Sequence, residues 1–130
     1  MKIFILISAL TLSSAAFSVE QCPVEFPSEN YLENVGKLIT ESDSCYSASE
    51  IADACALGAG GDVFTVGKAI SRCERDMPVM SKTDASMYAT LNDKCSEKYS
   101  TMEGSMYRSM EAFCHLQVTR LFLSLLTREE

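Results

Sequence analysis

Six cysteines and a single histidine carry the richest chemistry in this 130-residue sequence. Thiolates bind metals and attack electrophiles, and a cysteine beside a histidine can serve as an activated nucleophile. The cysteines are Cys22, Cys45, Cys55, Cys73, Cys95 and Cys114, and the histidine is His115. The closest two cysteines have nine residues between them, and no Cys-x-x-Cys pair occurs. This spacing argues against a zinc site and against a thioredoxin-like redox pair.

The first 18 residues have the anatomy of a secretory signal peptide. Lys2 gives the positive start, residues 3–12 are apolar, and small residues lead to the expected cleavage point after Ser18. Because a transmembrane helix needs about 20 apolar residues, an uncleaved anchor is disfavoured. Cys22 lies beyond the cleavage point, which also disfavours a lipoprotein. We expect residues 19–130 to be exported as one helical, disulfide-rich domain, extracellular or, in a bacterium, periplasmic.

In an oxidising compartment, the six cysteines are expected to form three disulfides. Fifteen pairings exist for six cysteines, and the sequence does not choose among them. Ten helical residues span about 15 Å, beyond the ~7 Å between bridged Cα atoms, so each bridge should join different helices. Buried helix faces are expected for Cys55, Cys73, Cys95 and Cys114. Cys22 and Cys45 are expected to fasten irregular segments.

The sequence assigns no catalytic residue, no metal and no cofactor. His115 is the one ordinary general base near neutral pH, but a disulfide at Cys114 would remove the thiolate beside it. Carboxylate pairs such as Asp93 and Glu97 occur on many solvated helices. The glycine-rich run at residues 58–63 lacks the phosphate-binding patterns. A hydrolase is therefore only the third alternative for function.

Apolar residues recur with the period of helices almost throughout residues 28–126. Helix starts are predicted at Ser28, at the Ser47-x-x-Glu50 capping box, at Asp62 and at Ser81. In the last third, one helix-like pattern continues to Leu125 through a Gly-Ser pair at residues 104–105. We favour two antiparallel helices there over one long rod. The predicted fold is all-α, a small four- or five-helix bundle linked by disulfides.

A cluster of methionine and aromatic residues in the last third is expected to form the core or to line a cavity for an apolar molecule. The cluster contains Met87, Tyr88, Leu91, Tyr99, Met102, Met106, Met110 and Phe113. Its stripe is expected to continue on the buried side through Gln117, Leu121 and Leu125. Tyr107 and Arg108 are predicted to point off this stripe. Both residue types are enriched in protein interfaces, so we expect these two at an interface.

The chain is acidic, with a formal net charge of −7 that becomes −8 when the leader, and with it Lys2, is removed. This charge argues against nucleic acid as a partner and favours a basic protein. The carboxylates are spread along the chain as on an ordinary solvated surface, and the mature chain has no expected membrane span. The favoured function is a secreted, non-enzymatic binder of another extracellular protein, inhibitor- or effector-like. The alternative is a carrier of a small hydrophobic ligand, and the oligomeric state is left open.

Overall fold

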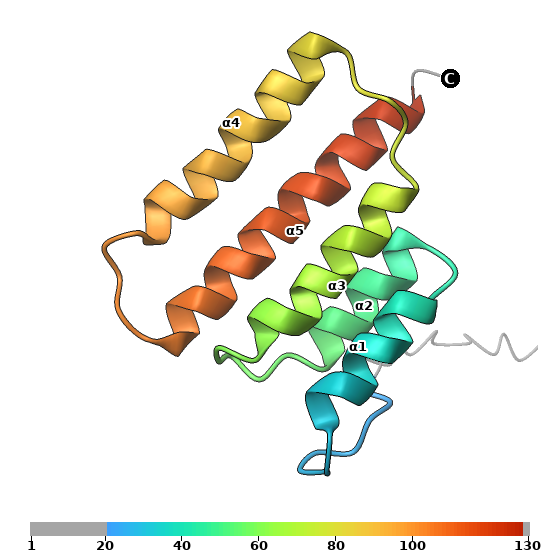
Figure 1. Ribbon diagram of the computed structural model, residues 1–130, viewed down its shortest axis with the longest axis vertical. Coiled ribbons are helices and arrows are strands. Elements are labelled where there is room, and N and C mark those ends of the chain that lie inside the picture. Colours follow the sequence, from blue (N-terminus) through green and yellow to red (C-terminus); the bar gives the residue numbers. More distant parts are fainter. Residues whose placement is uncertain (1–20, 129–130) are drawn as a thin grey trace, which may run out of the picture.

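The computed structural model describes residues 21–128, which form five α-helices and no strand. The helices are α1 (Tyr31–Glu41), α2 (Cys45–Ala54), α3 (Asp62–Arg75), α4 (Lys82–Tyr99) and α5 (Ser105–Arg128) (Figure 1). The predicted all-α, disulfide-linked bundle is confirmed. The predicted signal peptide, residues 1–18, lies outside the described residues.

Helices α3 and α5 pack against each other and join two groups of helices. Helices α1 and α2 pack on α3, whereas α4 packs on α5 at the outer edge of the bundle (Figure 1). Gly104 separates α4 from α5 and has a φ of 112°, which strongly favours glycine. The prediction of two helices in the last third, rather than one rod, is therefore confirmed.

Three disulfides hold the helices together. Cys45–Cys73 joins α2 to α3, Cys95–Cys114 joins α4 to α5, and Cys22–Cys55 ties the segment before α1 to the end of α2. Two of the bridges join different helices, as predicted, and Cys22 fastens an irregular segment, as also predicted, although its partner Cys55 directly follows α2 and does not lie within it. The expectation for Cys45 was wrong, because this residue opens α2 and does not lie in an irregular segment.

The helix starts show how short polar side chains set the boundaries. Ser81 caps α4 as predicted, its Oγ accepting the Asp84 N–H at 3.0 Å. Ser44, and not Ser47, caps α2, since its Oγ accepts the Ser47 N–H at 3.1 Å. Helix α1 begins later than predicted, after Asn30, whose φ is 57°. These differences shift the predicted starts by two or three residues.

The core lies among α1, α2, α3 and the middle of α5. Its largest fully buried apolar side chains are those of Val35, Ile39, Val66 and Leu116. Each contributes roughly 1.5–3 kcal/mol to stability by leaving water. Small buried residues fill the rest of the helix contacts, namely Ala48, Ala52, Ala69 and Ala112. Because alanine is short, the helix backbones can approach one another closely.

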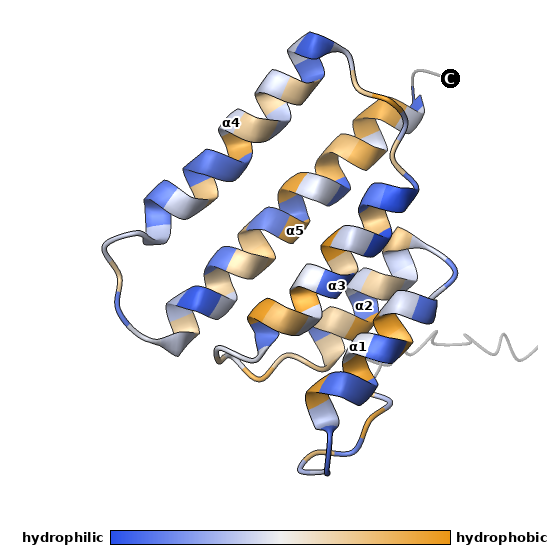
Figure 2. Ribbon diagram, viewed as in Figure 1, coloured by the Kyte–Doolittle hydropathy of each residue, from blue (hydrophilic) through white to orange (hydrophobic). Residues whose placement is uncertain are grey.

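Helix α5 is oriented differently from the prediction. Its buried residues are Ser109, Ala112, Leu116, Thr119 and Phe122. The residues placed on the buried stripe instead form what we call the outer stripe, Met106, Met110, Phe113, Gln117, Leu121 and Leu125. Phe113 is half-buried and the other five are exposed. Figure 2 shows that hydrophobic residues extend along much of α5, especially toward its C-terminal end.

Candidate functional site

All six cysteines are oxidised, so the chain offers no free thiol. Cys114 is bonded to Cys95 and cannot act as a nucleophile beside His115. The chemistry around the histidine therefore depends on its other neighbours.

A hydrogen-bonded chain of three side chains, which no sequence motif indicated, links α4 to α5. His115 Nδ1 lies 2.7 Å from Asn92 Oδ1, and His115 Nε2 lies 3.3 Å from Ser96 Oγ. When Nδ1 carries the proton and donates it to Asn92, Nε2 can accept the hydroxyl proton of Ser96. The signal in the sequence was the spacing of Asn92 and Ser96, which puts them on one face of a helix.

This Ser-His-Asn order matches the order of nucleophile, base and orienting group in hydrolases, but it lacks an oxyanion hole. Ser96 lies inside α4, where the neighbouring amide N–H groups are used by the hydrogen bonds of the helix itself. Its side chain is also exposed to water. We therefore assign these three residues the task of aligning α4 on α5.

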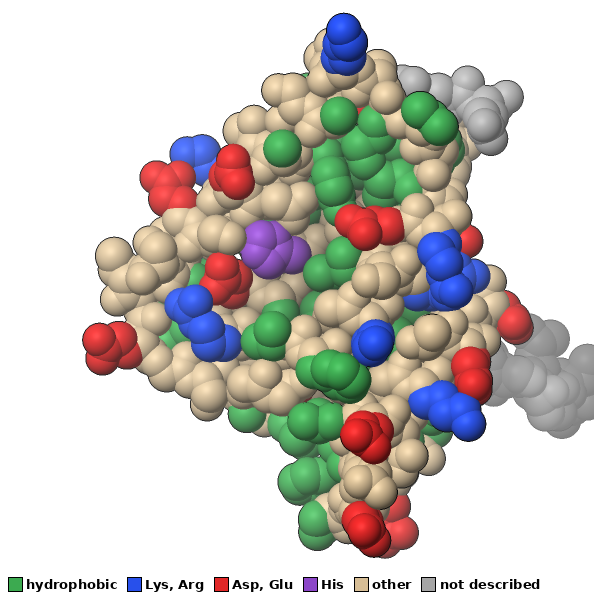
Figure 3. All heavy atoms as spheres, viewed as in Figure 1, with side chains coloured by type: hydrophobic (Ala, Val, Ile, Leu, Met, Phe, Trp, Pro, Cys, Tyr) green, Lys and Arg blue, Asp and Glu red, His purple; other side chains and the backbone are tan. Residues whose placement is uncertain are grey.

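Beside the histidine, a hollow of about 400 Å³ lies between α3 and α5. Its lining is largely apolar and includes Val63, Gly67, Ile70 and Ala112, with Arg108, Glu111 and His115 on the polar side. Figure 3 shows the histidine at this hollowed surface, with acidic and basic side chains beside it.

Arg108 was predicted to lie at an interface, and its guanidinium makes hydrogen bonds and an ion pair within the same chain. Its Nη2 donates to the carbonyl oxygens of Tyr99 at 2.8 Å and Met102 at 3.3 Å, and its Nη1 lies 2.8 Å from Glu111 Oε2. This guanidinium therefore caps the C-terminal end of α4. Tyr107, its predicted companion, is half-buried.

The predicted cavity-lining cluster is split between the interior and the surface. Tyr99 is buried, and Tyr88, Leu91 and Phe113 are half-buried. The methionines are exposed, with exposed fractions of 51% for Met87, 39% for Met102, 51% for Met106 and 42% for Met110. These four side chains do not enclose a cavity, so the expectation that they line the interior was wrong.

The charge of the molecule is distributed unevenly, and the whole-chain count concealed this. Residues 21–61 contain seven carboxylates and one basic residue, whereas residues 62–128 contain eight carboxylates and nine basic residues. Six of the seven carboxylates in the first part are exposed, and Glu50 is half-buried. The one basic residue there, Lys37, lies 4.0 Å from Glu41. The negative charge of the described residues is thus concentrated on the segment before α1, on α1 and on α2.

Apolar side chains are exposed among these carboxylates. Phe26 is 60% exposed and Leu57 is 39% exposed. Both line a shallow hollow of about 420 Å³ with Tyr31 and Glu33 at the start of α1. We call this region the acidic tip and define it by Glu25, Phe26, Glu29, Glu33 and Leu57. Acidic and hydrophobic side chains gather at the corresponding end of the molecule in Figure 3.

Covalent and polar contacts fix the backbone of the acidic tip. Cys22 is bonded to Cys55, and the Tyr31 hydroxyl donates to the Cys55 carbonyl at 2.9 Å. The buried Asp62 carboxylate accepts the N–H groups of Leu57 at 2.9 Å and Gly58 at 2.8 Å. Asp62, where the sequence predicts the start of a helix, is the first residue of α3, and its carboxylate orders the preceding loop.

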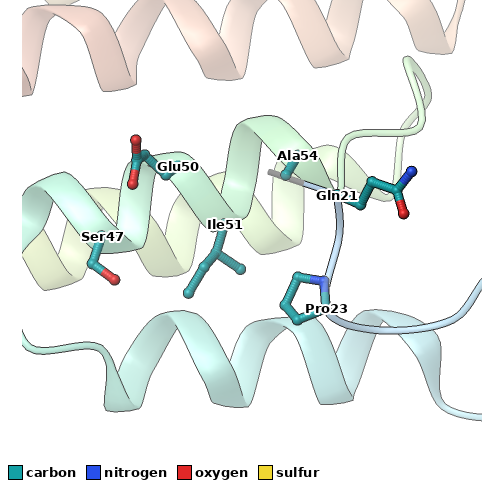
Figure 4. A pocket seen from close by; sticks show the side chains of 6 residues that line it. All are labelled: Gln21, Pro23, Ser47, Glu50, Ile51 and Ala54. Carbon is teal, nitrogen blue, oxygen red and sulfur yellow. The ribbon is translucent and has the colours of Figure 1, made fainter. Parts of the chain in front are cut away.

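A third, smaller hollow of about 190 Å³ lies beside α2. Figure 4 shows its lining, with Ser47, Glu50, Ile51 and Ala54 on the helix and Gln21 and Pro23 on the N-terminal segment that runs past it. Burial raises the pKa of the neighbouring Asp53, the charge of Glu50 raises it further, and Arg120 opposes both. Glu50 and Asp53 place negative charge on α2, and Arg120 of α5 offsets part of it.

No protein-family model, curated protein or solved structure matches this chain. Within residues 21–128, no three His, Cys, Asp or Glu side chains are grouped to hold a metal ion. No helix in that same part of the chain is long and apolar enough to cross a bilayer.

Proposed function

We propose that this protein is a secreted, non-enzymatic interaction protein that binds a basic extracellular protein through the acidic tip. The observation that carries the proposal is the concentration of seven carboxylates against one lysine in residues 21–61. A surface of one sign attracts a partner of the opposite sign and raises its association rate.

The apolar residues of the acidic tip can add affinity to the long-range attraction that its charges exert on a basic partner. Exposed charges at the rim of an interface contribute little affinity, whereas large apolar side chains at its centre contribute much more. Phe26 and Leu57 provide such side chains among Glu25, Glu29 and Glu33. The disulfide and the Asp62 hydrogen bonds order this backbone in advance, which reduces the entropy lost on binding.

Export is part of the proposal and has its own test. Three disulfides with no free thiol fit an oxidising compartment. The intact mass of the naturally exported protein, measured before and after reduction, should correspond to a chain that begins at Val19. Alkylation should modify no cysteine before reduction and all six after it. Free thiols in the unreduced protein would contradict export into an oxidising compartment.

The binding test uses the oxidised protein and a panel of purified secreted proteins, strongly basic and acidic, of similar size. We expect binding to basic members only, and weakening of that binding by salt. The double variant Glu29→Gln, Glu33→Gln should lower the affinity about fivefold, or about 1 kcal/mol for two exposed charges.

The matched control is Asp93→Asn with Glu97→Gln, which removes two exposed carboxylates from α4. This control should leave the affinity unchanged. Equal losses in both variants would mean that net charge alone, and not the acidic tip, governs binding. Binding to no basic protein of the panel would count against the proposal itself.

The carrier alternative has one observation in its favour, the hollow beside His115. Its volume of about 400 Å³ falls within the range of small-molecule sites, and its lining is mostly apolar. Arg108 and Glu111 at its polar side already bind each other at 2.8 Å. We rank this function second because the hollow is open and because the methionines that were expected to line a ligand cavity are exposed and do not line this hollow.

A further inference from the structure

The outer stripe of α5 is a long row of largely exposed apolar side chains, of which Phe113 alone packs partly against the core. Met106, Met110, Leu121 and Leu125 are 51%, 42%, 48% and 46% exposed. Soluble monomers seldom expose large apolar residues in a continuous row, and such rows mark interfaces. From Met106 to Leu125 the row is about 28 Å long at 1.5 Å per residue.

We propose that the outer stripe pairs with the same stripe of a second copy of this chain, the two α5 helices running antiparallel with Gln117 at the two-fold axis. The stripe is almost symmetric about this residue. Phe113 and Leu121 each lie four residues from it, and Met110 and Leu125 lie seven and eight residues from it. In an antiparallel pair centred there, apolar side chains face apolar side chains between residues 110 and 125, and Met106 faces the stem of Arg128 at each end.

The one polar residue inside the stripe would set the register of this pair. A glutamine at the axis meets its own copy, and two amide side chains can donate to and accept from each other. Any shift along the helix would bury each amide against apolar side chains without a hydrogen bond, which costs free energy. A single buried polar residue fixes the register of paired helices in the same way.

Charge complementarity also favours a second copy. Glu103 lies 14 residues before Gln117, and Arg128 lies 11 residues after it. Glu103 lies in the loop just before α5, and Arg128 is the last residue of α5, so the antiparallel arrangement brings the loop that carries Glu103 of one copy near the helix end that carries Arg128 of the other, at both ends of the pair. The stripe also belongs to the nearly neutral part of the chain, with eight carboxylates and nine basic residues, so the acidic tips do not oppose this contact.

The size of the contact decides how tight the pair is. A stable interface buries about 800 Å² per partner, and one pair of helices over about 28 Å buries less. We therefore expect a reversible dimer. Sedimentation equilibrium of the oxidised protein from about 1 µM to about 1 mM should show the average mass rising from one chain toward two.

Leu121→Glu, at an exposed position in the stripe, should keep the protein monomeric across this range and leave its circular dichroism unchanged. Val79→Glu is the matched control, because Val79 is fully exposed and lies outside the stripe. This control should dimerise like the parent. A parent protein that stays monomeric, or a Leu121→Glu variant that dimerises as well as the parent, would overturn the proposal.

Cross-linking tests the register independently of stability. Under a mild oxidant, Gln117→Cys should form a covalent dimer, since its two copies meet at the axis. Leu125→Cys should not, because its two copies would lie about 24 Å apart along the helices. Cross-linking of both variants would indicate a parallel pair, and cross-linking of neither would exclude the contact. Leu121→Glu should still bind a basic protein, so failure of the dimer and failure of the acidic tip are distinguishable.

Discussion

At the scale of single residues, Asp62 orders part of the proposed binding surface. Its side chain is 1% exposed and accepts hydrogen bonds from the Leu57, Gly58 and Ala59 amides and from the Ser109 hydroxyl. One carboxylate therefore orders the loop of the acidic tip and attaches it to α5. A sequence can show that an aspartate precedes a helix, but it cannot show that four donors from two distant segments converge on it.

The variant Asp62→Asn should unfold more easily than the parent. The amide nitrogen of asparagine is a donor and would face backbone N–H groups that need an acceptor. Hydrogen bonds to a charged group contribute about 1.5–3 kcal/mol each, and several are disturbed, so we expect a loss of about 2–4 kcal/mol in the free energy of unfolding. Urea unfolding followed by circular dichroism measures this loss.

Asp93→Asn is the control for this substitution, since Asp93 is exposed on α4. It should change the free energy of unfolding by less than about 0.5 kcal/mol. An Asp62→Asn variant as stable as this control would show that the carboxylate does not hold the loop.

At the scale of elements, α4 and α5 show what helical periodicity can and cannot predict. The period correctly put Tyr88, Leu91 and Tyr99 on the side of α4 that faces α5. It also correctly grouped Met106, Met110 and Leu121 on one side of α5, but that side is exposed. Periodicity identifies residues that share a face, and it does not identify which face packs when both are apolar.

Polar contacts help to determine which face of α5 is buried, and a hydrophobic pattern cannot detect such contacts. Ser109 donates to Asp62 at 2.6 Å, and the Thr119 hydroxyl lies 2.8 Å from the Tyr88 hydroxyl. The small Ser109 and Ala112 face the closely packed α3 side. The disulfide pairing also depended on tertiary packing. The predicted helices excluded bridges within one helix, and the packing of α2 on α3 and of α4 on α5 determines which cysteines meet.

The Cys95–Cys114 bridge should matter most for α4, whose main packing partner is α5. Replacing both cysteines by serine removes a cross-link between residues 19 apart in sequence. Chain entropy predicts a loss of about 3 kcal/mol. We expect amide hydrogen exchange to accelerate mainly in α4, while α1, α2 and α3 stay protected.

The double variant Cys22→Ser, Cys55→Ser provides the comparison, because its bridge lies at the other end of the molecule. Exchange should then accelerate in the segment before α1 and at the end of α2. Equal acceleration in all five helices after either double substitution would argue against two groups of helices with separate cross-links.

At the scale of the whole molecule, the uneven charge is the feature that relates the fold to a function. The acidic tip carries exposed negative charge at one end, whereas α4 and α5 offer a nearly neutral surface with an apolar stripe. The two proposed contacts, with a basic protein and with a second copy, are formed by different elements of the fold. Total charge and length predicted a small acidic domain. They did not show that the carboxylates are concentrated in residues 21–61, which only the order of charged residues along the chain reveals.

The most direct test of the proposed function is to locate the contact with a basic partner. The oxidised, isotope-labelled protein, residues 19–130, would be titrated with a basic secreted protein that binds it in the panel, and the backbone amide NMR shifts would be followed. We predict that the shifts gather at residues 25–33 and at Leu57 and Gly58, and that they diminish as salt is added. Shifts confined to α4, to the outer stripe of α5 or to the hollow beside His115 would contradict binding through the acidic tip.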